Sequence, residues 1–192
     1  MISKIEKQVK YKIDNFDFIS KKLIEMEAIF IGGFLEKSIR YDNENLDYSK
    51  NGIFLRSKKG IKNVLTLKEI PNIESQSSLE RIKTEIEVDD ILKLDYLLEK
   101  IGLNKKFIME KYRLYFKYKD NEITIDELPF GLYMEIKGND NEIKKVIKFL
   151  NIKQKNLIKC TYWDIYDRIK DKEDNENIVF ESNHVFKIAT YL

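Results

Sequence analysis

Apolar and polar residues alternate along eight stretches of the chain, and a period of two is typical of β-strands. In the first stretch, from Lys4 to Ile13, apolar residues fall on one side and charged or amide residues on the other, with Lys7 as the exception. The same pattern predicts strands over Phe34–Tyr41, Ile53–Lys58, Lys62–Glu69, Leu79–Val88, Met109–Lys117, Glu122–Glu127 and Leu132–Lys137.

Other stretches carry apolar residues at helical spacing. Three of them follow polar side chains that can cap a helix, at Asp14–Asn15, Asp89–Asp90 and Asn139–Asp140, and a fourth helix is predicted over Thr161–Lys170. We expect the first helix to end at Gly32–Gly33 and the second at Gly102. The order strand, cap, helix, glycine occurs twice, which indicates a weak two-fold repeat.

The polar sides of these strands are unusually charged, with Lys, Arg, Glu and Asp repeated at every second residue. An open sheet with helices on one face and water on the other is one interpretation. Like charges so close repel unless something lies between them, which favours a closed sheet around a ligand. This second interpretation is an α+β fold, a closed antiparallel β-barrel or tunnel with a charged lumen and helices packed outside.

The composition of the chain limits which ligands and metals it can bind. The chain has 192 residues and 35% charged residues, against about a quarter in most globular proteins. Its net charge is only +2, so net charge gives no reason to expect nucleic acid or a membrane surface as a partner. With one His and one Cys, a zinc site of the usual kind is excluded. A metal would be held by carboxylates, which favours Mg²⁺, Mn²⁺ or Ca²⁺.

The charged strands resemble, in order, those of the CYTH family, the triphosphate tunnel metalloenzymes. The family's first strand reads Glu-x-Glu-x-Lys, and here the matching residues are Glu6, Gln8 and Lys10. Further matches cover about residues 1 to 170. They are Leu55–Arg56, Leu65–Lys68, Arg81–Glu87, Lys111–Arg113, Ile125–Leu128, Tyr133–Gly138 and Thr161–Tyr162.

The resemblance implies a role for each matching charge. The residues that would hold the triphosphate are Lys10, Arg56, Lys68, Arg81, Lys83, Lys111, Arg113 and Lys137. Those available to Mg²⁺ or Mn²⁺ are Glu6, Gln8, Glu85, Glu87, Asp126 and Glu135. The residues expected closest to the reaction are Glu6, Lys10, Lys111 and Arg113. In the family, metal ions activate the attacking group, and the protein supplies position and charge neutralisation.

Gln8 departs from the family pattern, because its amide can ligate a hard cation but brings no charge. The first hypothesis for function is a class IV adenylyl cyclase, which converts ATP to cyclic AMP and pyrophosphate. The alternatives are an inorganic or thiamine triphosphatase and a non-catalytic module that binds polyphosphate or nucleotide.

The matches predict one tunnel domain over residues 1–170, followed by a polar loop and a short tail over 171–192. The tail ends in apolar residues that are expected to dock on the domain. The start of the chain lacks an apolar signal segment, no apolar run approaches the roughly 20 residues of a membrane span, and the single cysteine fits a reducing compartment, so we expect a cytoplasmic protein. Expected partners are a nucleoside or other triphosphate and, as an option, a second copy in a homodimer.

Overall fold

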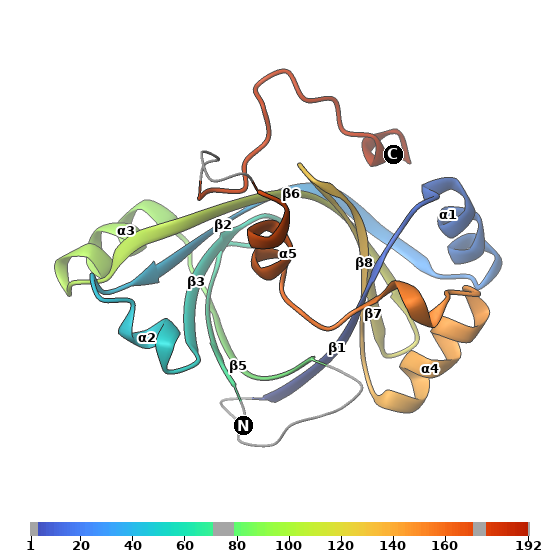
Figure 1. The fold of residues 1–192 in the computed structure, drawn as a ribbon, viewed down its shortest axis with the longest axis horizontal. Helices are drawn as coiled ribbons and strands as arrows, with labels where there is room; N and C mark the ends of the chain where they lie inside the picture. The colour runs from blue at the N-terminus through green and yellow to red at the C-terminus, as the bar shows by residue number, and fades with distance from the viewer. Residues whose placement is uncertain (1–3, 71–78, 171–175, 192) are drawn as a thin grey trace.

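The computed structural model describes residues 4–70, 79–170 and 176–191 (Figure 1). Pro71–Ser78, a mostly polar stretch whose composition predicts a loop, lies outside these residues. The strands are β1 (Lys4–Lys12), β2 (Ile29–Asp42), β3 (Ile53–Lys59), β4 (Val64–Glu69), β5 (Leu79–Glu87), β6 (Asn104–Tyr118), β7 (Asn121–Leu128), β8 (Gly131–Lys137) and β9 (Leu157–Ile158). The helices are α1 (Phe16–Glu25), α2 (Asp47–Lys50), α3 (Ile91–Lys100), α4 (Asp140–Phe149) and α5 (Tyr162–Ile169).

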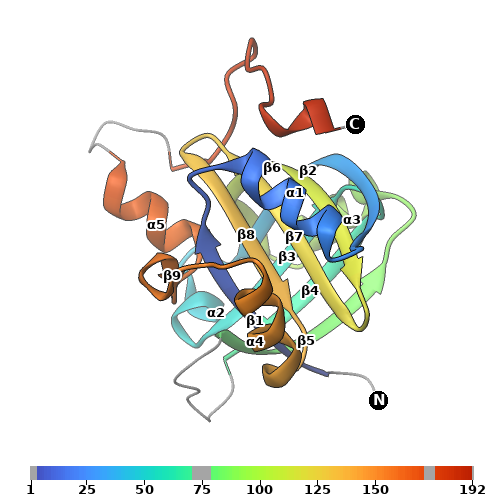
Figure 2. The same ribbon diagram turned by 90° about the vertical axis from the view of Figure 1, so that its right-hand side faces the viewer.

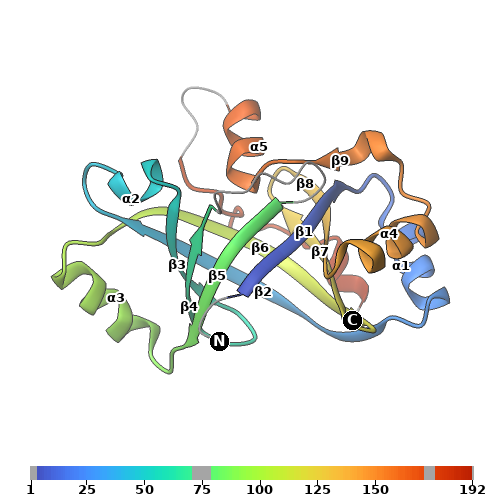
Figure 3. The same ribbon diagram turned by 90° about the horizontal axis from the view of Figure 1, so that it is seen from below.

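The sheet closes on itself. Within the described residues, antiparallel pairing runs in the order β5-β4-β3-β2-β6-β7-β8-β1, and β1 also pairs with β5, so these strands form a ring. Figure 1 shows this ring end-on, and Figure 3 shows β1 beside β5, where the ring closes. The predicted closed antiparallel barrel is confirmed, and the open sheet is wrong. A closed ring leaves its inner face away from bulk water, so the charged side chains there must find partners.

The weak two-fold repeat seen in the sequence corresponds to the two halves of the ring. The unit β1-α1-β2-β3-β4 is followed by β5-α3-β6-β7-β8. Because β1 lies beside β5 and β2 lies beside β6, exchanging the two halves maps the strand order onto itself. Each half therefore contributes an equivalent wall to the interior.

Apolar side chains cover the outside of the ring. The outward residues Leu114, Ile123, Ile125, Met134 and Ile136 are fully buried in one cluster. Helices α1 and α4 lie over this face, and Leu23, Ile143 and Val146 complete the same cluster (Figure 2). The three predicted caps are confirmed, since the side chains of Asn15, Asp90 and Asn139 each accept a hydrogen bond from the first turn of a helix. Thr161, predicted as the first residue of the fourth helix, caps that helix in the same way.

The end of the first helix and the start of the strand after it differ from the prediction. Helix α1 ends at Glu25, seven residues before Gly32–Gly33, and the glycines lie inside β2. A register shift between Phe30 and Gly32 marks a β-bulge there, with φ at +152° for Gly32. A Cβ on Gly33 would lie 2.8 Å from the Leu114 side chain. The glycines therefore serve a bulge and a close strand approach, and they do not end a helix.

The described part of the tail docks on the outside of β6 and β7. The backbone of Ile178 exchanges hydrogen bonds with Ile108 and Glu110 at 2.8 and 2.7 Å. Glu127 accepts from the backbone of Ile188 at 3.0 Å and lies 2.9 Å from His184. The division at residue 170 stays a prediction. Among the described residues, no helix combines the length and the apolar character that crossing a membrane requires.

Candidate functional site

The ring encloses a cavity of about 460 Å³. Ten cationic side chains line it, namely Lys10, Arg40, Arg56, Lys58, Lys68, Arg81, Lys83, Lys111, Arg113 and Lys137. Six carboxylates line it, namely Glu6, Glu36, Glu85, Glu135, Asp164 and Asp167. The lining therefore carries an excess of four positive charges.

The structure brings most of the predicted site residues together. All eight cations assigned to triphosphate binding line the cavity, as do Glu6, Gln8, Glu85 and Glu135. Two predicted metal ligands do not. Asp126 is fully buried behind the lining, and Glu87 is exposed at the end of β5, where it pairs with Lys62. The structure thus does not place these two carboxylates where the sequence predicted a metal.

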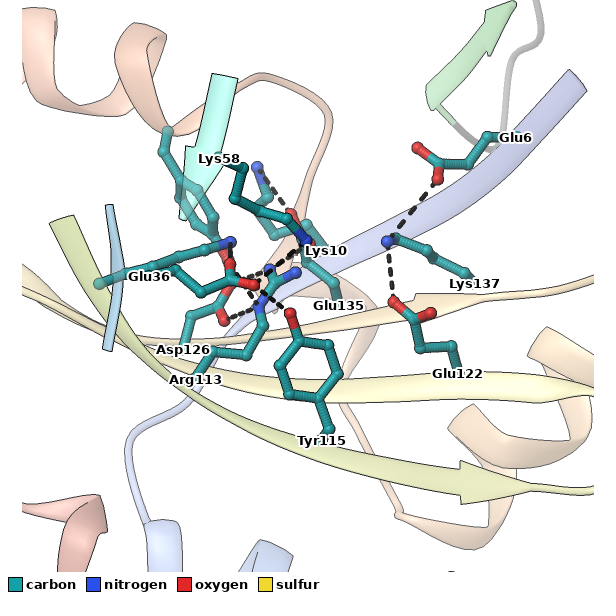
Figure 4. A network of polar contacts seen from close by, with 12 residues as sticks. Glu6, Lys10, Glu36, Lys58, Arg113, Tyr115, Glu122, Asp126, Glu135 and Lys137 are labelled. Carbon is teal, nitrogen blue, oxygen red and sulfur yellow. Dashed lines mark hydrogen bonds and ion pairs between the residues drawn. The ribbon is translucent and has the colours of Figure 1, made fainter. Parts of the chain in front are cut away.

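One side of the cavity is a buried ion cluster, which consists of Lys10, Glu36, Lys111, Arg113, Asp126 and Glu135 (Figure 4). Arg113 donates to both oxygens of Asp126 and, at 2.7 Å, to Glu135. Lys111 lies 3.4 Å from both Glu36 and Asp126. Three cations meet three carboxylates, so the cluster is neutral, as burial of charge requires.

The pKa values in the cluster follow from burial and pairing. Burial alone would raise the pKa of Glu135, but Arg113 and Lys10 hold it well below its ordinary value. Glu36 behaves in the same way, because Lys111 and Arg113 outweigh its burial and lower its pKa. Burial lowers the pKa of Lys10, against the attraction of Glu135. Both carboxylates are therefore ionised at neutral pH.

Helix α5 places a tyrosine against this cluster. Tyr162 donates from its hydroxyl to Asp126 at 2.7 Å, and the Lys10 ammonium lies 3.7 Å from the centre of its ring. Lys10 also donates to the backbone carbonyl of Cys160 at 3.1 Å. In Figure 1, α5 is seen across the opening of the ring. The helix expected on the outside thus contributes to the interior.

The other side of the cavity is a basic wall, which consists of Arg56, Lys58, Lys68, Arg81 and Lys83 on β3, β4 and β5, with Glu85 as the carboxylate among them. Lys68 stands directly opposite Lys83 in the strand register, and like charges in such positions repel. Among the described residues, no carboxylate lies within ion-pair distance of Arg56 or Arg81. The wall therefore carries cations without enough anions.

Glu6 on β1 is the main counter-charge of this region. It lies 2.6 Å from Lys68 and 3.7 Å from both Lys83 and Lys137. Burial would raise its pKa, but Lys137 and Lys68 lower it well below the ordinary value. One carboxylate thus serves three ammonium groups.

The pKa of Lys68 is lowered by burial and by the neighbouring cations. Burial lowers its pKa most, Glu6 opposes this, and Arg56 and Lys137 lower it further, to about 8. Lys58 shifts in the same direction, since burial outweighs its attraction to Glu36. An added anion at this wall would relieve the repulsion.

The sequence assigned no site role to Glu36, Arg40 and Tyr162, although Thr161–Tyr162 is one of the matches to the family. Glu36 is 1% exposed and joins the buried cluster to Lys58, which lies 3.3 Å away. It belongs to a stretch with a weak apolar pattern, where Glu36, Ser38 and Arg40 still alternate at period two. That alternation is the signal that identifies the inward face of β2. Nothing comparable in the sequence marks Tyr162 as buried in the lumen.

No preformed metal cluster is present in the part of the chain that the structure describes, because no three carboxylate, histidine or cysteine side chains converge there. The carboxylates of the cavity are instead separated by cations. Mg²⁺ often uses only one or two carboxylates together with substrate phosphates. Glu6 and Glu135 both line the cavity and are ionised, so either of them fits as the single carboxylate of such a site.

The sequence has a distant relative of similar extent. No family model matches the chain. A protein of Methanocaldococcus jannaschii named "Putative adenylate cyclase" is 24% identical over 172 residues, which covers 84% of this chain and 98% of that protein.

Solved structures share the fold. A "putative adenylate cyclase" of Vibrio parahaemolyticus superposes with a TM-score of 0.76 at 16% identity, covering 85% of this chain and 98% of the other. A "putative adenylyl cyclase" from Hippeastrum, named for a dominant triphosphatase activity, gives a TM-score of 0.61 at 15% identity, with 85% of this chain and 95% of the other covered. The resemblance read from the charged strands is therefore confirmed, and the chain is similar to the CYTH proteins of class IV adenylyl cyclase type.

Proposed function

We propose that this protein binds a triphosphate in its lumen and processes it with a divalent metal. One observation carries the proposal, namely the excess of cations in a closed cavity, ten against six carboxylates. A triphosphate is a compact polyanion whose oxygens accept many charge-assisted hydrogen bonds from Lys and Arg. Its binding would neutralise the excess charge that the fold concentrates there.

The two sides of the cavity would take different parts in binding. In the buried ion cluster the charges are already matched, so those side chains are held in place before a ligand arrives. The basic wall has more cations than carboxylates: Lys68 and Lys83 share Glu6, Lys83 also pairs with Glu85 at 2.9 Å, and Arg56 faces the cavity with no carboxylate within ion-pair distance among the described residues. We assign the phosphate chain to the basic wall and to Lys137, with the cluster as its rigid support.

The metal is part of this proposal. Glu6 or Glu135 would hold Mg²⁺ or Mn²⁺ together with the substrate, and Gln8 on the same face of β1 as Glu6 would offer an amide oxygen. The ion would supply charge neutralisation and activation of the attacking group. The protein's own residues orient the phosphate chain and exclude water.

We place adenylyl cyclase activity first, because the sequence relative and the Vibrio structure are both named adenylate cyclase, and we assign it to class IV from the resemblance of the charged strands. In this reaction the ribose 3′-oxygen of ATP bonds to the α-phosphorus, the bond to the β-phosphate breaks, and cyclic AMP, pyrophosphate and a proton result. Hydrolysis of a triphosphate is the second candidate, and the activity named for the Hippeastrum neighbour favours it.

The test is a product assay. Purified protein is incubated with ATP, tripolyphosphate or thiamine triphosphate, with Mg²⁺ or Mn²⁺ and with a chelator as control. Cyclic AMP with equimolar pyrophosphate supports the cyclase, and phosphate release supports the triphosphatase. Binding without turnover in any mixture would leave a non-catalytic module. Absence of binding to all three would contradict the proposed function.

A further inference from the structure

A second cavity, which we call the outer cavity, opens on the outside of the ring between the start of α1 and the end of α4. Figure 2 shows both helices on this outer face. The cavity measures about 330 Å³, and pockets that hold small molecules usually measure about 300–1,000 Å³. Tyr11 of β1 and Met134 of β8 line it with side chains that belong to the outer core. Among the described residues, none lines both the outer cavity and the lumen, so the two sites are separate.

The floor of the outer cavity is apolar. Its side chains are buried members of the outer core, namely Tyr11, Ile13, Ile19, Met134 and Leu150. Phe18 stands at the edge of this floor and is 42% exposed. Core side chains are closely packed and hold their positions. An apolar group in the cavity would therefore leave water and contact a fixed surface.

The wall on the α4 side is a turn fixed by backbone hydrogen bonds. Asn151 takes a left-handed conformation with φ at +52°, and its N–H donates to the carbonyl of Lys148 at 3.2 Å. The N–H of Ile152 donates to the carbonyl of Ile147 at 3.2 Å. This pair of hydrogen bonds is the Schellman motif, and it places Ile152 against the outer core. The shape of the cavity is thus set by the backbone.

The rim of the outer cavity is positively charged. Lys12 contributes from the end of β1, and Lys153 and Lys155 contribute from the segment around the short 3₁₀ helix η1 (Gln154–Asn156). Asp14 is the single carboxylate of the lining, which therefore carries an excess of two positive charges. Within the part of the chain that the structure describes, no carboxylate lies within ion-pair distance of these three ammonium groups. The rim can therefore pair with an anion.

We propose that the outer cavity binds a small organic anion with an apolar body, such as an aryl carboxylate, sulfonate or phosphate ester. The apolar body would lie on the floor beside Phe18, and the anionic group would pair with the three lysines of the rim. Asn151 and Asn156 line the same cavity and would add amide donors. An inorganic anion would gain the charge contacts alone, so it should bind far more weakly. This proposal does not depend on the function of the lumen.

The probe for this site is anilinonaphthalene sulfonate, an anion with an apolar body whose emission rises when it leaves water. It is titrated into the full chain with excess tripolyphosphate and Mg²⁺, which on the proposed function occupy the lumen. We expect saturable binding of one probe per chain. Inorganic sulfate at the same concentration should not displace it. Absence of saturable binding, or full displacement by sulfate, would overturn the proposal.

Two pairs of charge reversals test the rim. Lys153→Glu combined with Lys155→Glu should weaken the probe by about tenfold or more, because both partners of the anion become repulsive. The control is Lys144→Glu combined with Lys148→Glu, which makes the same change in net charge on exposed residues of α4 outside the cavity lining. At about 0.15 M salt, screening should keep the control within about threefold of wild type. Equal losses in the two variants would overturn the proposal, because charge alone would then explain binding.

Methyl NMR locates the probe directly, in the wild type and without reliance on any variant. Signals of Ile13, Ile19 and Ile152 should shift during the titration, whereas Ile82 on β5 should not. Met109 lines the lumen and serves as the second reference. Shifts at Met109 without shifts at the three isoleucines of the outer cavity would place the probe in the lumen and overturn the proposal. Should the charge-reversed rim variant not fold, these wild-type shifts decide.

Discussion

The buried ion cluster and the basic wall face each other across one cavity, but charges are balanced in the cluster and unbalanced in the wall. In the cluster, Arg113 is 5% exposed, Asp126 is fully buried, and cations and carboxylates are equal in number. In the wall, five cations have Glu85 among them, and Glu6 is shared between three ammonium groups. Matched charges can be buried without a ligand, whereas unmatched ones are tolerated where an anion can reach them.

This difference separates structural from binding roles among residues that look alike in the sequence. Arg113 and Arg56 both point inward from barrel strands, but Arg113 donates its hydrogen bonds to Asp126 and Glu135. Arg56 has no carboxylate within ion-pair distance among the described residues. We therefore expect changes in the cluster to affect stability first and changes in the wall to affect ligand affinity first.

The largest expected effect is on stability, from Asp126→Ala. The change removes the acceptor of Arg113, Lys111 and Tyr162, and leaves buried cations without a partner. Loss of one partner in a buried ion pair costs about 3–5 kcal/mol of the free energy of unfolding. Urea denaturation monitored by circular dichroism measures it.

The matched control is Glu87→Ala, which removes an exposed carboxylate paired with Lys62. Exposed pairs contribute about 0–1 kcal/mol, so this variant should unfold close to wild type. Equal losses in the two variants would contradict the distinction between the cluster and its surroundings.

The next effect is on affinity, from Arg56→Ala in the basic wall. A charge-assisted hydrogen bond contributes about 1.5–3 kcal/mol, so triphosphate binding should weaken about 10- to 150-fold. The free energy of unfolding should stay within about 0.5 kcal/mol of wild type or rise, since a cation leaves a crowded positive wall. Calorimetric titration with ATP and Mg²⁺ gives the affinity. Unchanged affinity with a large loss of stability would reverse the roles assigned to the two sides.

A third prediction concerns pH. The pKa of Lys68 is lowered to about 8 without ligand, and a bound anion would raise it. Only the charged form attracts phosphate, so affinity is retained below pH 8 and lost as the pH rises above it. We expect about a tenfold fall between pH 7 and pH 9, with proton uptake on binding near pH 8. Titrations in buffers of different ionisation enthalpy measure that uptake, and Lys68→Arg should reduce it. Proton uptake that is equal in wild type and variant would exclude Lys68 as its source.

The smallest expected effect comes from Gln8→Glu, which adds a carboxylate beside Glu6 on β1. The extra charge should tighten Mn²⁺ binding in the presence of triphosphate by about 2- to 10-fold, because hard cations prefer charged oxygen ligands. Electron paramagnetic resonance of Mn²⁺ follows free and bound metal. Unchanged Mn²⁺ affinity would mean that Gln8 takes no part in metal binding.

Most strands of the barrel could be predicted because the alternation of apolar and polar residues is visible within each short stretch of sequence. Alternation in residues such as Lys111, Arg113 and Asp126 identifies both the strands and their inward faces. Closure between β1 and β5 depends on pairing between distant segments, and only the charged character of the polar face hinted at it. The prediction that the first helix ends at Gly32–Gly33 was wrong because a pair of glycines is as typical of a β-bulge as of a helix end.

The sequence predicted which residues line the cavity better than it predicted which side chains pair with one another there. Side-chain direction follows from the strand, so the eight predicted cations line the cavity. Whether a carboxylate meets a cation or remains available depends on register and on neighbouring strands. Asp126 is directly opposite Arg113 in the ladder, a fact that no local pattern reveals. The contribution of α5 to the cavity could not be predicted from local patterns either, because Tyr162 donates to Asp126, 36 residues away in the sequence.

The central claim is that the basic wall holds the phosphates of a triphosphate. A crystal structure of the protein with a non-hydrolysable ATP analogue and Mn²⁺ tests it most directly, because phosphate density and anomalous metal signal are located independently. We predict three phosphates within hydrogen-bond distance of Arg56, Lys83 and Lys137, and Mn²⁺ at Glu6 or Glu135. Density for the analogue outside the ring, with the side chains of the wall unchanged, would contradict the account.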